Sequence, residues 1–190
     1  MPDIEVGDDL IKKCLAGKQS AMRSLYHICF ADMYRVSARY GKHPEDIQEI
    51  IDNSFLKILK GLETYKNDEK FPQWVRTIAI NSALDFVRAK QRKLKIFSDQ
   101  ELEVAEQTQI NDHREWNTDL EVRDIFKVMQ SLPEQYQIIL NLFAIEGYAH
   151  KEISEMMDIS VTTSRWYLSE ARKMMKDKLN QKNTHRYEGA

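Results

Sequence analysis

The chain has 190 residues, 42% of them hydrophobic and 31% charged, which is enough for one medium domain or two small ones. No apolar run approaches the roughly 20 residues of a membrane span, and the acidic N-terminus lacks the basic and apolar regions of a signal peptide. We therefore expect neither membrane insertion nor secretion. Cys14 and Cys29 have no metal-like or redox-like spacing, and we expect both to be reduced core residues of a cytoplasmic protein.

Charge is unevenly distributed along the chain, although the net charge is only −2. Residues 1–95 carry a net +4, residues 96–130 a net −6 and residues 131–190 a net zero. Six glycines and four prolines are few, which indicates a mostly helical chain. We predict an all-α protein in which two small helical domains, 1–95 and 119–182, are joined by an acidic flexible linker, 96–118, and followed by a polar tail, 183–190.

Hydrophobic periodicity predicts four helices in the first domain. A short helix begins at Asp8 and Asp9 and ends at Gly17, and a longer helix spans residues 20–40. The buried side of the longer helix is expected to hold its large apolar side chains, namely Met22, Leu25, Tyr26, Cys29, Phe30, Met33, Tyr34 and Val36. The third helix spans residues 45–62, and its acidic first half and basic second half suit the helix dipole.

The fourth predicted helix begins near Phe71 and Pro72, runs to about residue 93 and carries an unusual polar stripe. The members of the stripe follow one another at steps of three or four residues: Trp74, Thr77, Asn81, Asp85, Arg88 and Arg92. An aromatic ring, a hydroxyl and an amide beside arginines suit single-stranded nucleic acid, because bases stack on rings and phosphates pair with cations. A buried Trp with a capped polar stripe that holds neighbouring helices together accounts for the same pattern, so both interpretations stay open.

Helical periodicity stops in the acidic segment 96–118 and resumes at Leu120. One helix ends before Pro133, and the next opens at Pro133 and closes at Gly147. Residues 148–178 then predict a short helix, a tight turn at Asp158 and a longer helix with Ser160 as its N-cap. One face of the longer helix is apolar or small, at Ser164, Leu168, Ala171 and Met175.

This arrangement is that of a helix-turn-helix, whose second helix offers its N-terminal residues to base edges in the major groove of duplex DNA. The residues expected to contact DNA are Val161, Thr162, Thr163, Arg165, Trp166, Ser169, Arg172, Lys173 and Lys176. An antiparallel helical hairpin in a bundle shows the same periodicity, and basic residues late in a helix also suit its dipole. The helix-turn-helix pattern alone therefore leaves two interpretations.

Taken in order, the segments resemble a bacterial RNA polymerase sigma factor of the extracytoplasmic-function (ECF) group. EDIQEIIDNSFLKI (45–58) resembles the helix that binds the polymerase clamp, with Asp52 and Asn53 where the family more often has Gln and Glu. FPQWVRTIAINSALDFVR (71–88) resembles the promoter-melting helix. LPEQYQIILNLFAIEGYAHKEISEMMDIS (132–160) and TTSRWYLSEARKMM (162–175) resemble the fourth conserved region and its recognition helix, with Asp158, Ser164 and Glu170 as departures.

The resemblance implies an alternative sigma factor that binds core RNA polymerase and directs promoter-specific transcription initiation. Such a factor reads the −10 element as melted single strand with its first domain and the −35 element as duplex with its second. The resemblance also implies an anti-sigma factor as a partner, and it implies polymerase contacts at Asp46, Glu49, Asp52, Asn53 and Leu56.

Two other classes of function are weighed against this one. A stand-alone helix-turn-helix transcriptional regulator would bind duplex DNA without polymerase, and a helical adaptor would bind no nucleic acid at all. An enzyme is not expected, because the five His are dispersed and no nucleophile–base pair or metal spacing occurs. We accordingly predict no metal, no cofactor and no small-molecule substrate.

Overall fold

The structure is a computed structural model that describes residues 6–66, 70–97 and 120–188. The described residues form helices and contain no strand, as predicted. The predicted acidic linker, 96–118, lies outside the described residues except for its first two positions. The chain divides into two compact units, Met1–Asp112 and His113–Ala190, and each is described by itself.

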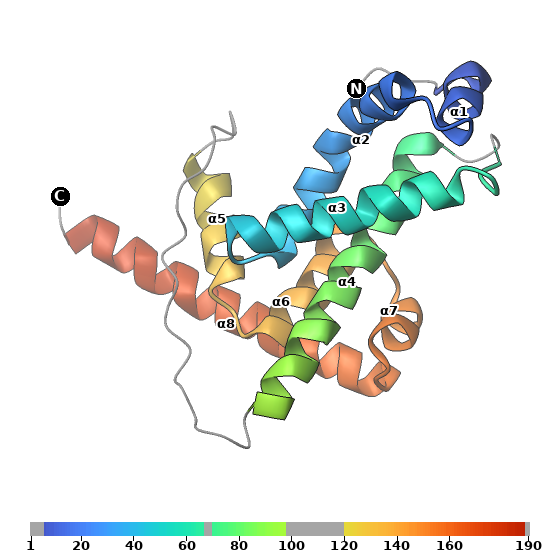
Figure 1. The fold of residues 1–190 in the computed structure, drawn as a ribbon. Helices are drawn as coiled ribbons and strands as arrows, with labels where there is room; N and C mark the ends of the chain where they lie inside the picture. Colours follow the sequence, from blue (N-terminus) through green and yellow to red (C-terminus); the bar gives the residue numbers. More distant parts are fainter. Residues whose placement is uncertain (1–5, 67–69, 98–119, 189–190) are drawn as a thin grey trace. The chain divides into compact units, whose positions relative to one another are not determined.

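The first unit is built on three long helices that pack on one another (Figure 1). These are α2 (Gln19–Tyr40), α3 (Pro44–Gly61) and α4 (Phe71–Phe97), and the short α1 (Asp8–Leu15) lies against α2. Gly7 occupies the N-cap of α1, so Asp8 and Asp9 lie in its first turn instead of capping it. Gly17 ends this helical segment as predicted, with a φ of 74° that a residue with a side chain rarely adopts.

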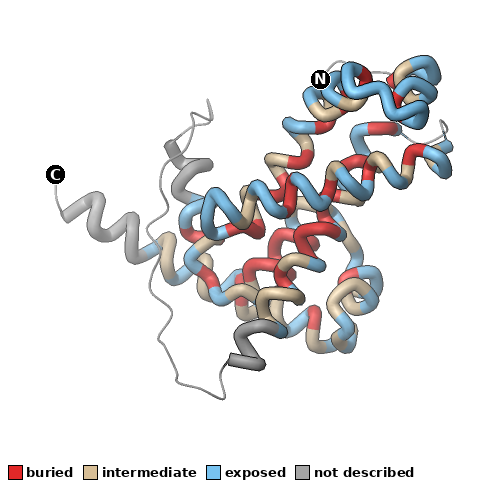
Figure 2. Tube along the Cα trace, viewed as in Figure 1, coloured by how far each residue is buried: buried red, intermediate tan, exposed pale blue. Residues whose placement is uncertain are grey.

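The core of the first unit follows the predicted apolar faces (Figure 2). Fully buried members come from each long helix: Leu25 and Met33 from α2, Ile50, Ile51 and Ile58 from α3, and Val75, Ala79, Ile80 and Ala83 from α4. Cys14 and Cys29 are both buried and unpaired, which confirms that they are free core thiols. The prediction for Phe30 was wrong, because its side chain is 37% exposed at the edge of the apolar face of α2.

One glycine of the first unit permits a close approach of two helices. Gly41 follows α2, and a Cβ added there would lie only 2.7 Å from Ile47 Cγ1 and 2.9 Å from the Ile47 backbone nitrogen. Its φ of −78° is ordinary, so the missing side chain, and not an unusual backbone, is what this position requires. The turn from α2 into α3 is therefore as tight as a glycine allows.

The second unit is organised around its last helix, α8 (Val161–Glu188), against which α5 (Leu120–Gln130), α6 (Glu134–Leu140) and α7 (His150–Met157) pack (Figure 1). The backbone of α8 continues to Glu188, through most of the segment predicted as a polar tail. Buried residues of this unit include Val128, Ile138, Ile139, Leu142, Ile153, Leu168 and Ala171.

Between α6 and α7 the backbone makes a π-helical turn, Asn141–Ile145, which is labelled η1. The Glu146 N–H donates to the Asn141 carbonyl at 3.0 Å, five residues back instead of the four of an α-helix. Gly147 then takes a φ of 79° and leads the chain into α7. This turn was not predicted, because a short apolar run has the same composition whether its backbone bonds span four residues or five.

Within the described residues, no helix combines the length and the apolar character that crossing a membrane requires.

Candidate nucleic-acid interfaces

The turn of the helix-turn-helix has the predicted geometry. Asp158 follows α7 with φ 53° and ψ 49°, the left-handed conformation that a short polar side chain tolerates best. The Ser160 hydroxyl accepts the Thr163 backbone N–H at 2.9 Å, which confirms Ser160 as the N-cap of α8. At the other end of α7, the Glu152 carboxylate accepts the Ala149 backbone N–H at 2.7 Å. Both helices therefore begin at fixed positions.

The inner face of α8 combines apolar packing with one polar contact. Ser164, Leu168 and Ala171 are buried as predicted, and the Ser164 hydroxyl lies 2.9 Å from His150 Nδ1 on α7. The His150 ring also stacks on Phe143, with 4.7 Å between the ring centroids. Burial lowers the pKa of His150, and the positive charges of Arg165 and Arg172 lower it further. The His150 ring thus links the two helices.

The outer face of α8 carries the residues predicted to contact duplex DNA. Seven of them are exposed on one side of the helix, namely Thr162, Arg165, Trp166, Ser169, Arg172, Lys173 and Lys176, and the remaining two, Val161 and Thr163, are half-buried in the first turn. The side chain of Thr163 is engaged by the cap, since its hydroxyl lies 2.8 Å from that of Ser160. The structure thus brings most of the predicted set together on a basic, solvent-facing surface.

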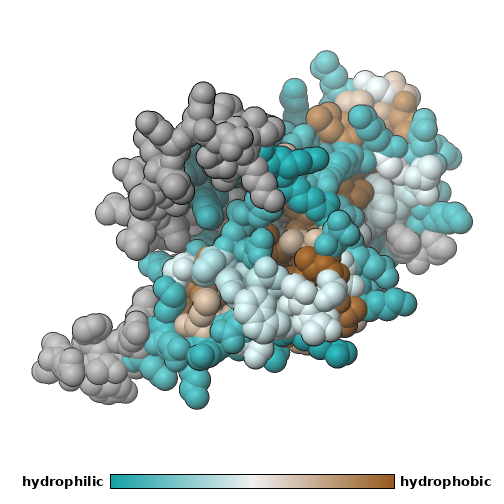
Figure 3. Space-filling model, turned by 90° about the horizontal axis from the view of Figure 1, so that it is seen from below, coloured by the Kyte–Doolittle hydropathy of each residue, from teal (hydrophilic) through white to brown (hydrophobic). Residues whose placement is uncertain are grey.

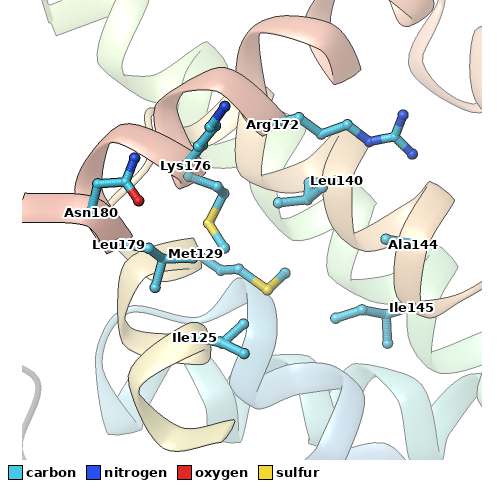
Figure 4. Close-up of a pocket in the computed structure, with 10 residues that line it drawn as sticks. Ile125, Met129, Leu140, Ala144, Ile145, Arg172, Lys176, Leu179 and Asn180 are labelled. Atoms are coloured by element: carbon cyan, nitrogen blue, oxygen red, sulfur yellow. The ribbon is translucent and has the colours of Figure 1, made fainter. Parts of the chain in front are cut away.

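A groove on the second unit was missed at the level of sequence (Figure 4). It has a volume of about 480 Å³, and its walls come from α5, the end of α6, the π-turn and α8: Ile125, Met129, Leu140, Ala144, Ile145, Arg172, Met175, Lys176, Leu179 and Asn180. Arg172 also lies over the Phe143 ring, with 5.5 Å from its guanidinium carbon to the centroid. Arg172 and Lys176 therefore line the groove in part, and Arg165 is the arginine best placed to contact DNA.

The polar stripe on α4 divides into residues that hold the fold and residues that face solvent. Asp85 accepts hydrogen bonds from Lys57 on α3 at 2.7 Å and from Arg88 at 3.1 Å. The Thr77 hydroxyl donates to the Gln73 carbonyl within the same helix, at 3.0 Å. Asn81 and Arg92 are exposed, as Arg88 is.

Trp74 belongs to an aromatic cluster within the first unit. Its ring centroid lies 4.8 Å from that of Tyr65 and 5.6 Å from that of Phe71. On its other side the ring approaches Gly61, where an added Cβ would lie 2.9 Å from it. Trp74 is thus half-buried and packed against Tyr65, Phe71 and Gly61, as the fold-holding interpretation of the stripe expects. The exposed Asn81 and Arg92 fit the nucleic-acid interpretation.

The outer face of α3 presents four of the five residues expected to meet polymerase. Glu49, Asp52 and Asn53 are exposed, and Leu56 is 55% exposed, a large fraction for an aliphatic side chain. Among the described residues coloured in Figure 3, hydrophilic side chains lie beside separate apolar patches. Leu56 therefore places one exposed aliphatic side chain on the otherwise polar outer face of α3.

Asp46, the fifth residue, is held inside the first unit. Its carboxylate accepts the backbone N–H groups of Lys42 at 3.1 Å and His43 at 3.3 Å, and it pairs with Lys90 on α4 at 3.0 Å. Burial by itself would raise the pKa of Asp46, but the hydrogen bonds from Lys90, Lys42 and His43 outweigh it and hold the pKa below its usual value. The capping pattern, an acidic residue three positions after His43, was visible in the sequence.

Comparison with known proteins identifies the class to which these two units belong. Residues 25–93 match the family described as Sigma-70 region 2, and residues 123–175 match Sigma-70, region 4. The two matches span the long helices of the first unit and the helix-turn-helix of the second. The chain belongs to the sigma-70 family of RNA polymerase sigma factors.

Its relatives place it within that family. RNA polymerase sigma factor SigV of Bacillus subtilis is 26% identical over 170 residues, which cover 87% of this chain and 98% of that protein. ECF RNA polymerase sigma-E factor of Haemophilus influenzae is 29% identical over 143 residues, or 70% of this chain and 75% of that protein. The chain is a sigma factor of the extracytoplasmic-function group, an alternative factor that directs transcription initiation and catalyses no reaction itself.

A solved structure shows the same fold. The sigma factor RpoE from Bartonella quintana, determined in complex with the anti-sigma factor NepR, aligns with a TM-score of 0.56 over 83% of this chain and 96% of its own length. The sequences are 13% identical in that alignment. The matches to both regions decide between the two DNA-binding classes weighed from the sequence, in favour of the sigma factor and against the stand-alone regulator.

Proposed function

We propose that each unit carries one promoter-reading surface and that the first unit also carries the polymerase-binding surface. In this assignment, residues 1–95 bind core RNA polymerase through the outer face of α3 and read the melted −10 strand along α4. Residues 119–182 read the −35 duplex with α8. The acidic segment 96–118 joins the two, and the factor works in the cytoplasm, where polymerase and promoter meet.

The single observation that supports the duplex assignment is the exposed outer face of α8, in which Arg165 stands between Thr162 and Ser169 in the first three turns. Arginine reads guanine through two parallel hydrogen bonds, and each such pair contributes about 1–3 kcal/mol of discrimination. Arg165→Ala should therefore weaken use of the upstream element by about tenfold or more. Lys12→Ala, which removes an exposed cation from α1, is the matched control.

Run-off transcription with core polymerase tests the function as a whole. The purified chain should confer initiation from a promoter library on core enzyme that is inactive alone, and a gel shift should show tight promoter binding only when core enzyme is present. Absence of stimulation from every promoter, or equally tight binding without core enzyme, would contradict the proposal.

For the −10 surface, Asn81 is the residue that the structure leaves most clearly available. Its amide is exposed in the middle of α4, and amide groups hydrogen-bond to the edges of flipped bases. Asn81→Ala should lower the yield of open complex, measured by permanganate reactivity, while holoenzyme still forms. On a template already melted over the −10 element, Asn81→Ala should still weaken binding of the holoenzyme in a gel shift, because the defect lies in recognising the bases and not in separating them.

We further propose that polymerase meets the outer face of α3 at Glu49, Asp52, Asn53 and Leu56, with Asp46 acting from inside the unit to hold that face in place. An anti-sigma factor is the expected regulatory partner, as for the sigma factor from Bartonella quintana. If core enzyme and the anti-sigma factor bind the same face of α3, Asp52→Ala should weaken the binding of both. A competition assay between core enzyme and the anti-sigma factor measures this.

A further inference from the structure

The outer face of α8 contains a large apolar side chain among polar ones. Trp166 is 53% exposed, in the second turn of the helix, and its neighbours on this face are Thr162, Arg165 and Ser169. An indole of which more than half lies in water carries an unfavourable hydration cost on a surface that is otherwise polar. The position is the one from which a recognition helix reaches base edges.

The indole ring is braced from behind. Its centroid lies 6.0 Å from that of Tyr136 on α6 and 5.1 Å from that of Tyr167, and the two tyrosine rings meet edge to face at 5.1 Å. The Tyr167 hydroxyl in turn donates a hydrogen bond to the Gln135 side chain on α6. Side chains from two helices thus contact the ring, while about half of Trp166 remains exposed.

A braced ring of this kind loses little conformational freedom when it binds, because its position is set before the ligand arrives. Its chemistry also limits what it can recognise in a duplex. The indole has a single N–H donor and no acceptor, so it cannot make the paired hydrogen bonds that identify guanine or adenine. The apolar group that a major groove displays on a base edge is the C5-methyl group of thymine.

We propose that Trp166 is a specificity-determining residue that reads the C5-methyl group of a thymine in the upstream duplex element. The inference rests on the proposed role of α8 as the duplex reader. Tyr136 and Tyr167 act as positioning residues that hold the ring, and Arg165 beside it makes the polar contacts.

The test compares thymine with uracil, which differs from it only by the absence of this methyl group. A promoter library is synthesised with a randomised upstream cassette, once with thymine and once with deoxyuridine on both strands of the cassette, and the rest of the promoter is kept constant. Both libraries are transcribed by core polymerase with the full chain, and the transcribed templates are sequenced. Because each preparation transcribes both libraries, any difference in its folded fraction cancels.

With the wild-type chain, at least one cassette position should show a preference for thymine that falls by about fourfold in the uracil library, the effect of burying one methyl group. Trp166→Gln should select the same bases from both libraries. Arg165→Ala serves as the comparison, since it should weaken selection overall while the difference between thymine and uracil persists.

Equal selection of thymine and uracil by the wild-type chain, together with normal dependence on the upstream cassette, would overturn the inference and leave the proposed function standing. Persistence of the thymine preference in Trp166→Gln would overturn it too, because another residue would then be the reader. If the wild-type chain selects no sequence from either cassette, the proposed duplex reader fails along with the inference.

Discussion

Substitution of Asp46 tests whether this residue stabilises the fold of the first unit, as its contacts indicate. Its carboxylate accepts two backbone N–H groups ahead of α3 and pairs with Lys90 on α4, and only 16% of the side chain is exposed. Loss of a capping acceptor costs about 1 kcal/mol, and loss of a partly buried hydrogen bond between charged groups costs about another 1 kcal/mol. Asp46→Ala should therefore lower the free energy of unfolding by about 2 kcal/mol.

Urea unfolding of the full chain measures this change. Trp74 lies in the aromatic cluster of the first unit, so its fluorescence reports that unit alone once Trp116 and Trp166 are replaced by Phe. A double-mutant cycle with Lys90→Met isolates the contact between α3 and α4, for which we expect a coupling of about 1 kcal/mol. Glu49→Ala, on the exposed face of the same helix, is the control and should stay within about 0.5 kcal/mol of wild type.

The stability that Asp46 contributes should change with pH in a defined direction. The pKa of Asp46 is lowered in the folded chain, so its stabilisation is fully present above the ordinary carboxyl value of 3.8 and is lost as the pH falls below it. Wild type and Asp46→Ala should therefore converge in acid. Unchanged stability of Asp46→Ala at neutral pH, or a coupling to Lys90 below about 0.3 kcal/mol, would refute this account.

Three further predictions concern other parts of the chain. Gly41→Ala should cost about 1–3 kcal/mol in the same urea assay, because the new Cβ would lie 2.7 Å from an atom of Ile47, and a stability equal to wild type would contradict the close approach. Leu56→Asp should weaken binding of core polymerase by about tenfold or more, measured by fluorescence anisotropy. Stability should stay unchanged, because Leu56 is 55% exposed. Binding equal to that of wild type would remove Leu56 from the interface. His150 has a lowered pKa, so the unfolded chain takes up its proton first and stability should fall as the pH drops below 6.5. His150→Gln should flatten the profile of melting temperature against pH there, and an unchanged slope would assign the effect to other groups.

Local signals in the sequence were sufficient for most of the helices and for the turn of the helix-turn-helix. Asp158 and Ser160 were predicted from the backbone preferences of their own residue types, and the structure has both in those roles. The apolar spacing of Ser164, Leu168 and Ala171 likewise identified the buried face of α8. Such features depend on neighbours a few residues away, which the sequence displays directly.

Features that depend on residues from distant parts of the chain were harder to predict. The buried side of α2 was placed correctly, but its edge was not, because the helices that pack on it leave Phe30 partly uncovered. Two interpretations of Trp74 stayed open at the level of sequence, and its packing against Tyr65 and Phe71 is a contact that the polar stripe does not display. The groove of the second unit joins α5 to the middle of α8, and the sequence shows only the four-residue spacing of Met175 and Leu179 on one wall.

The π-helical turn at Asn141–Ile145 has a consequence for how chains of this kind tolerate changes in length. Successive residues of an α-helix are rotated by about 100° around its axis, so the one additional residue in the π-turn changes the direction in which the chain leaves α6 by about that angle. Deleting a single residue there would restore α-helical pairing and swing the start of α7 around α6, with no loss of any DNA-facing side chain. A deletion of one residue is usually regarded as a minor change between homologues. At this position it would reorient the helix-turn-helix formed by α7 and α8.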